Sequence, residues 1–302
     1  MSFPLRRLPF LAINEVIQSM DTRAIFFLSV LSKKSANFVM LSIPRNSLSA
    51  NFTFRKNGFL FELMPKGFQK QTADIIPEVP YISERASEIK EFSDCGLYVK
   101  CGWTYFSEVE KYTRKLFYRF SKTFKNSKFH IKLEYDTREE LAMEIMRFAW
   151  GNDFLLNRIY FYLHNSSSES IQELLNRCND PHTSLFIRTK LPKGFRCTPP
   201  PGGFKFETLS VNYAHWVNPD DFLQCRVVSL WGRVPRLTVK YVNELLKKIV
   251  NSECRLENFA LPLWKMPRDF AQIVRGLSVK EGKHFWDSVF GTFAFKYLLF
   301  CK

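Results

Sequence analysis

An alternation of strand-like and helix-like segments, beginning near residue 129, constrains the fold of this chain more than any other feature. The strand-like segments are short, rich in β-branched and aromatic residues, and recur every 20 to 30 residues or so. We predict strands at residues 129–135, 157–163, 184–189, 205–211, 226–231 and 256–261. Such a β-α series implies parallel strands joined by right-handed crossovers. We therefore predict an α/β, repeat-like domain with a mainly parallel sheet, whose strand order the sequence does not give.

The segments between the predicted strands carry helix signals. Two hydroxyl residues stand three positions before a glutamate, which is the spacing of a capping box at a helix start. These pairs are Thr137 with Glu140 and Ser166 with Glu169. Asn218 followed by Pro219 predicts another helix start, residues 242–249 predict a longer amphipathic helix, and residues 267–276 predict one more. The run PPPGG at residues 199–203 lacks the lysine and hydroxyl of a phosphate loop, so we interpret it as a rigid turn.

Two segments with other patterns precede this domain. Residues 51–68 alternate apolar and polar side chains around Gly58, which predicts a β-hairpin or two edge strands. Residues 69–94 contain two prolines and six acids, which is typical of a long surface connection.

The N-terminal segment, residues 3–44, predicts three short helices. Three apolar stretches at helical spacing are separated by polar residues, and Asp21 or Thr22 is placed to cap the second helix. Pro44 ends the third helix. A unit of this size has too small a core to be stable alone, so we expect it to pack on something else.

Composition narrows the class of protein. The 302 residues are 46% hydrophobic and include 31 Phe, which predicts a folded chain with aromatic packing rather than a disordered one. The net charge of +15 fits nucleic acid, an anionic membrane or an acidic partner, and charge alone does not choose among them. The seven scattered cysteines favour reduced thiols.

No targeting or catalytic signature appears. The apolar run from Leu8 ends at Asn14 before a signal-peptide core forms, and the run over residues 24–31 is too short to span a bilayer. We therefore expect a soluble cytoplasmic or nuclear protein with no membrane partner. Cys95 and Cys101 have no second pair at zinc-like spacing, and no catalytic motif is present, so we expect no metal, no cofactor and no active site.

The run LPFLAINEVIQSMDTRAIFFLSVLSKKSANFV, which starts at Leu8, resembles the F-box. Leu8 and Pro9 form its opening dipeptide, Asp21 stands at the break before the second helix, and two lysines form its basic corner. One departure is the missing tryptophan after the corner, where Ser35 stands. The version here is similar to that of the large nematode-type F-box group.

A second stretch, residues 205–277, resembles the F-box-associated domain of the same group, above all in RLTVKYVNELLKKIVNSECRLENFAL. The order of the two matches implies an F-box over residues 3–44 and an associated α/β substrate-recognition domain over residues 51–302. The tail from about Lys280 does not match the family pattern.

The resemblance implies a non-catalytic adaptor of a Skp-cullin-F-box ubiquitin ligase. Its partners would be the Skp-type linker, the cullin scaffold and a protein substrate that the sequence does not identify. An F-box offers apolar side chains to the linker, although each of them can equally belong to the internal core of the helices. The candidate contacts are Leu8, Pro9, Val16, Ile17, Ile25, Leu28 and Leu31.

The alternative function is nucleic-acid binding through residues 111–128, which contain basic and aromatic residues and no acid. The candidate anion-binding residues are Lys111, Arg114, Lys115, Arg119 and Lys122. Because Phe117, Phe120 and Phe124 share one helical face, we favour an amphipathic helix with aromatics in the core and a basic outer face. On that interpretation nucleic acid is not the expected partner.

Overall fold

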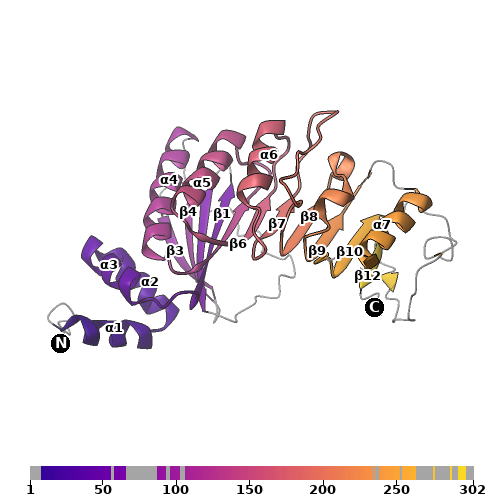
Figure 1. Ribbon diagram of the computed structural model, residues 1–302. Coiled ribbons are helices and arrows are strands. Elements are labelled where there is room, and N and C mark those ends of the chain that lie inside the picture. The colour runs from indigo at the N-terminus through magenta and orange to yellow at the C-terminus, as the bar shows by residue number, and fades with distance from the viewer. Residues whose placement is uncertain are drawn as a thin grey trace. The chain divides into compact units, whose positions relative to one another are not determined.

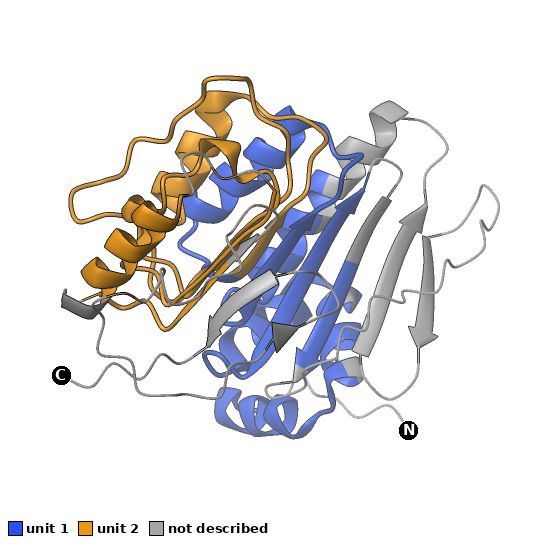
Figure 2. Ribbon diagram, turned by 90° about the vertical axis from the view of Figure 1, so that its right-hand side faces the viewer, with its two compact units in different colours: residues 1–157 blue, residues 158–302 orange. Residues whose placement is uncertain are grey.

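The computed structural model describes residues 8–55, 58–65, 87–92, 96–102, 106–232, 234, 238–251, 254–262, 275, 286–287 and 292–296 (Figure 1). The chain divides into two compact units, residues 1–157 and 158–302, whose boundary falls within one strand (Figure 2). Both units combine helices with β-strands, as the sequence predicted. Within the described part of the chain, no helix is both long and apolar enough to cross a membrane.

Unit 1 begins with the three predicted helices, α1 (Phe10–Ser19), α2 (Thr22–Leu31) and α3 (Lys33–Ser42). The amide of Ala24 donates to Oδ1 of Asp21 at 2.7 Å, so Asp21 caps α2 as expected. The amide of Ser35 donates to Oγ of Ser32 at 3.1 Å, and this cap starts α3. Short polar caps therefore turn the chain between the helices.

The sheet of unit 1 contains the predicted hairpin. Strand β1 (Leu48–Arg55) pairs antiparallel with β2 (Gly58–Pro65), and Phe52 lies opposite Phe61. The alternative of two edge strands is wrong, because β1 also pairs parallel with β5 (Lys128–Leu133) and β2 pairs antiparallel with β4 (Gly96–Gly102). Both hairpin strands are therefore interior to the sheet.

A further hairpin adds β3 (Ser87–Phe92), antiparallel to β4. Strand β3 lies inside residues 69–94, which the sequence indicated to be a connection, and residues 69–86 and 93–94 lie outside the described residues. The prediction missed β3 and β4; the acids and prolines of residues 69–94 obscured the alternation of β3, whereas β4 follows that segment and contains neither.

Helices α4 (Phe106–Thr123) and α5 (Glu139–Gly151) enclose an aromatic core with this sheet. The Phe52 ring in β1 stacks on Phe129 at 5.3 Å and meets Phe117 of α4 edge-on at 5.1 Å between centroids. Aromatic pairs of this kind contribute about 0.5–1.5 kcal/mol beyond the burial of their surface. The predicted aromatic packing is confirmed here, since all three rings are fully buried.

Unit 2 consists of parallel strands that pair in chain order, at the places the sequence predicted. They are β6 (Leu155–Phe161), which starts at the end of unit 1, β7 (Ser184–Ile187), β8 (Thr208–Val211), β9 (Val227–Leu230) and β10 (Asn258–Pro262). In the tail, β12 (Thr292–Lys296) pairs antiparallel with β10, and β11 (Trp286–Asp287) pairs antiparallel with β12. The predicted, mainly parallel sheet is thus confirmed for this part of the chain.

One row of buried side chains runs across these parallel strands in strict register. Each member occupies the same level of its strand and pairs with the next member along the sheet, with exposure between 0% and 4%. The row is Ile159, Leu185, Leu209, Val228 and Phe259. The members of this row are among the apolar residues whose alternation in the sequence predicted the strands.

The crossovers of unit 2 differ from one another. Helix α6 (Ser168–Arg177) joins β6 to β7, and α7 (Val239–Asn251) joins β9 to β10, as expected. Two short 3₁₀ turns, η2 (Ala214–Trp216) and η3 (Pro219–Phe222), join β8 to β9. The helix predicted over residues 267–276 lies outside the described residues, apart from the turn at residue 275.

The predicted capping boxes are wrong, because tertiary contacts occupy both hydroxyls. Thr137 Oγ1 donates to the carbonyl of Phe54 at 3.0 Å, and α5 starts two residues later without a side-chain cap. Thr189 Oγ1 donates to Ser166 Oγ at 3.0 Å, and Ser167 caps α6 by accepting from the amide of Ser170. Buried hydroxyls satisfy distant partners here in preference to local amides.

Candidate functional site

The three N-terminal helices carry most of the large apolar side chains that the described part of the chain exposes. Of five such side chains, four belong to these helices. They are Phe10, 47% exposed, Leu11, 76% exposed, Leu31, 72% exposed, and Leu41, 59% exposed. The fifth, Tyr213, is 39% exposed and belongs to unit 2. Concentration of exposed apolar side chains on one small segment is typical of an interaction surface.

The same helices bury serines on their inner faces. Ser29 is 1% exposed, and its Oγ donates to the carbonyl of Phe26 at 2.6 Å. Ser35 and Ser42 are also buried, at 4% and 1% exposure. These three serines lie among buried apolar side chains of the same helices, such as Ile13, Ile17 and Phe26. The unusual feature is therefore the set of large apolar side chains on the outer faces, which indicates an interaction surface.

The predicted linker contacts divide into three groups. Pro9 and Leu31 are exposed, whereas Leu8, Val16 and Leu28 are partly exposed. Ile17 and Ile25, at 0% and 7% exposure, belong to the internal core.

The predicted linker contacts did not include Phe10, Leu11 or Leu41, which the structure exposes. A helical wheel places Leu11 more than 100° from the buried Ile13 and Ile17, at about 100° per residue, so that signal was available.

Contacts with the rest of unit 1 hold the three helices by one side. Phe26 of α2 packs against Phe61 of β2 and Phe120 of α4, with centroids 6.0 and 5.5 Å apart. Asn126, in the turn after α4, donates from Nδ2 to the carbonyl of Ile43 at 3.1 Å. The amide of Asn46 donates to the carbonyl of Asn126 at 2.7 Å. Residues from β2, α4 and the turn after α4 thus complete the small core of the three helices and attach the helices to unit 1.

Helix α4 has the amphipathic character that the sequence favoured. Phe117 and Phe124 are fully buried, and Phe120 is 3% exposed. Four basic side chains on or just after the helix are exposed, namely Lys115, Arg119, Lys122 and Lys125. Lys111 lies in the first half of α4, where only the path of the backbone is described.

Arg114 differs from these residues, because it forms an ion pair inside unit 1. Its Nη2 lies 2.8 Å from Oε2 of Glu144 in α5, and its Nε donates to the same oxygen at 2.9 Å. Tyr118 donates from its hydroxyl to Oε1 of Glu144 at 3.0 Å, and burial together with this bond raises the pKa of the phenol. The predicted anion-binding residue Arg114 therefore serves to join α4 to α5.

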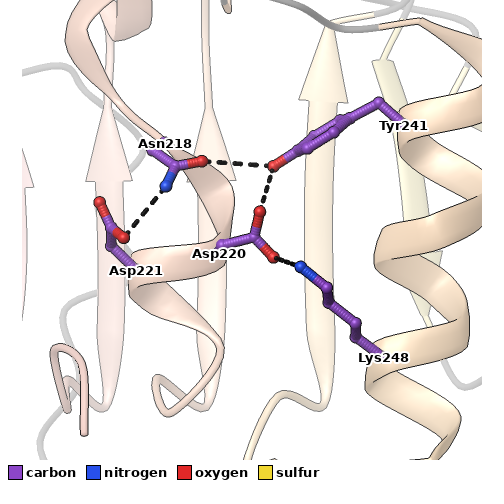
Figure 3. A network of polar contacts seen from close by, with 5 residues as sticks. All are labelled: Asn218, Asp220, Asp221, Tyr241 and Lys248. Atoms are coloured by element: carbon purple, nitrogen blue, oxygen red, sulfur yellow. Dashed lines mark hydrogen bonds and ion pairs between the residues drawn. The ribbon is translucent and has the colours of Figure 1, made fainter.

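A polar cluster of unit 2 joins η3 to α7 (Figure 3). Asp220 accepts from the hydroxyl of Tyr241 at 3.0 Å and from Nζ of Lys248 at 2.7 Å. Asn218 donates from Nδ2 to Asp221 at 3.0 Å, and its side-chain oxygen lies 3.4 Å from the Tyr241 hydroxyl. Sequence reasoning did not find this cluster, because its members belong to two separate crossovers.

The cluster links η3 to α7 through hydrogen bonds and one ion pair. Burial, followed by the charge of Asp220, raises the pKa of Tyr241, so the phenol remains a donor. Burial also raises the pKa of Asp221. Its polar groups are directed at one another, and among the described residues no group of three His, Cys, Asp or Glu side chains could hold a metal ion.

Comparison with known proteins gives no match to a family model, to a curated protein or to a solved structure. The outer faces of the three N-terminal helices are therefore the candidate functional surface.

Proposed function

We propose that this chain is a substrate-recognition adaptor of a Skp-cullin-F-box ubiquitin ligase, with α1 to α3 as its F-box. The single observation that carries the proposal is the exposure of four large apolar side chains on the outer faces of these helices, Phe10, Leu11, Leu31 and Leu41. A partner that covers the outer faces would remove this apolar surface from water, which contributes about 1.5–3 kcal/mol for each leucine fully buried. The resemblance of the run from Leu8 to the F-box supplies the class of partner, the Skp-type linker.

The proposal assigns no chemistry to the chain itself. The helices would bind the linker, the linker would bind the cullin scaffold, and the α/β domain would capture the protein to be ubiquitinated by other subunits. The contacts of Phe26 with β2 and α4 support this division, because they give the proposed linker-binding helices a defined position on the sheet of unit 1.

Co-expression with a Skp-type linker protein tests the proposal. The intact chain should co-purify with the linker, and Leu31→Asp should weaken the complex about tenfold or more, because a charge would be buried at the interface. The matched control is Tyr213→Asp, which places the same charge at an exposed apolar position of unit 2 and should leave the complex intact. Leu8→Asp and Pro9→Ala extend the test to the opening dipeptide.

Two results would overturn the proposal: no complex with the intact chain, or equal binding by the intact chain and Leu31→Asp. Because Leu31 is 72% exposed, its replacement should not alter the fold, and circular dichroism of each variant checks this.

A further inference from the structure

The outer face of α4 forms a row of cations. Lys115, Arg119 and Lys122 are spaced at i, i+4 and i+7, which places them on one side of the helix, and Lys125 follows just after its end. At 1.5 Å per residue, the row extends about 10 Å from Lys115 to Lys122 and about 15 Å to Lys125. The buried phenylalanines Phe117, Phe120 and Phe124 hold the opposite side in the core.

Acidic side chains do not neutralise the lysines of this row. Across the described residues, Lys115, Lys122 and Lys125 have no carboxylate within ion-pair distance, whereas Arg114 pairs with Glu144 and Lys132 pairs with Glu134. The described acids Glu144 and Glu134 thus pair with other residues than these three lysines. Lysines that lack a carboxylate among the described residues attract a partner of the opposite sign.

Two further lysines lie close in sequence to a backbone carbonyl that Arg119 contacts. Nη2 of Arg119 lies 3.5 Å from the carbonyl of Ser29 in α2, and Ser32, three residues later, caps α3. Lys33 and Lys34 follow that cap and are exposed, with the Lys34 ammonium 5.8 Å from the centre of the Phe38 ring. We define the basic surface as Lys33, Lys34, Lys115, Arg119, Lys122 and Lys125.

We propose that the basic surface binds an extended acidic segment of a protein. An extended chain advances about 3.3 Å per residue, so a row of about 15 Å matches four to five residues. Lysines dominate the surface, and their flexible point charges suit carboxylates at variable positions better than the fixed two-point recognition of a guanidinium. The proposal does not depend on the linker protein, so it can stand or fail separately from the adaptor function.

The aromatic side chains favour a peptide over single-stranded nucleic acid. Sequence-tolerant binding of single strands depends on exposed aromatics on which bases stack. Phe117 and Phe120 of α4 and Phe124 just after it are buried, and Tyr118 is stacked on Phe148 at 4.0 Å between centroids. The described part of α4 therefore offers charge without a stacking platform.

Fluorescence anisotropy with a labelled oligoglutamate peptide and the full chain tests the proposal. The triple variant Lys115→Glu, Lys122→Glu, Lys125→Glu should lose about tenfold or more in affinity, and binding to the intact chain should weaken steeply with salt. The matched control is Lys193→Glu, Lys240→Glu, Lys247→Glu, which changes the net charge equally at exposed positions of unit 2 and should bind as the intact chain does.

Three results would overturn the proposal. The first is equal loss in both triple variants, which would show attraction to net charge alone. The second is no binding by the intact chain at low salt. The third is tighter binding of a single-stranded RNA of equal charge that depends on the same three lysines, which would assign the surface to nucleic acid. A Lys→Gln version of the triple variant, with thermal unfolding of each protein, separates loss of binding from loss of fold.

Discussion

The ring of Phe26 in α2 and the ring of Phe120 in α4 lie 5.5 Å apart, centroid to centroid, although 94 residues separate them in sequence. Phe26 is 1% exposed and also contacts Phe61 of β2. This contact binds the three helices to the sheet of unit 1, so their stability is coupled to that of the α/β part.

Phe26→Ala should therefore destabilise unit 1 by about 3–5 kcal/mol, the usual cost of truncating a buried phenylalanine. We expect hydrogen exchange in α1 to α3 to increase more than exchange in β1, because the helices lose their anchor. Leu31→Ala in the same helix is the control, and it should change the free energy of unfolding by less than about 0.5 kcal/mol, as exposed positions do. Equal effects of the two substitutions would contradict the anchoring role.

Gly203 and Gly202 make a matched pair for testing the turn at residues 199–203. Both have positive φ, at 78° and 81°, but a Cβ on Gly203 would meet the carbonyl oxygen of Asp221 at 2.9 Å, whereas one on Gly202 would meet nothing within 4 Å. Gly202→Ala should cost about 1–2 kcal/mol from backbone strain alone. Gly203→Ala should cost more in urea unfolding, because it also displaces the bond from the amide of Phe204 to Asp221.

The pH dependence of stability should include a contribution from Glu207. Arg226 donates from Nε to Glu207 at 2.7 Å and from Nη1 to Glu257 at 2.8 Å. The bond from Arg226 lowers the pKa of Glu207 below its usual 4.5. The contribution is therefore present above about pH 4.5 and is lost as the pH falls through the lower pKa of the folded state.

Arg226→Met removes both bonds, so the fall in unfolding free energy below pH 4.5 should be shallower in this variant than in the intact chain. Denaturant titrations at several pH values measure the difference. Superimposable pH profiles would contradict the assigned cause.

Tyr241 should ionise later than an ordinary tyrosine. Burial and the adjacent Asp220 raise its pKa above 10, so its stabilising contribution is complete below pH 10 and is lost as the pH rises through the higher pKa of the folded state. Near-ultraviolet absorbance titration of the intact chain and of Tyr241→Phe should differ by one late-ionising phenol. Tyr241→Phe should also cost about 1 kcal/mol through the lost bond to Asp220.

The hairpin of β1 and β2, the strands β5 to β10 and the buried face of α4 could be predicted because each depends on periodicity within one segment, whereas β3, β4, β11 and β12 were missed. The capping of α5 could not, because Thr137 bonds to Phe54, 83 residues away. The link between Asp220 and Tyr241 requires knowledge that two crossovers lie side by side. The exposed leucines could be predicted in part. A helical wheel places Leu31 and Ser29 on different sides of α2, but only the contact of Phe26 with Phe120 shows which side faces inward.

The buried row from Ile159 to Phe259 keeps one register, although the crossovers between its members are a helix, a helix-free loop, two 3₁₀ turns and another helix. The sheet thus tolerates different connections without any change in its own pairing. Exposed residues of those connections could therefore be replaced, to engineer a new binding surface, without a change in the register of the scaffold that carries them.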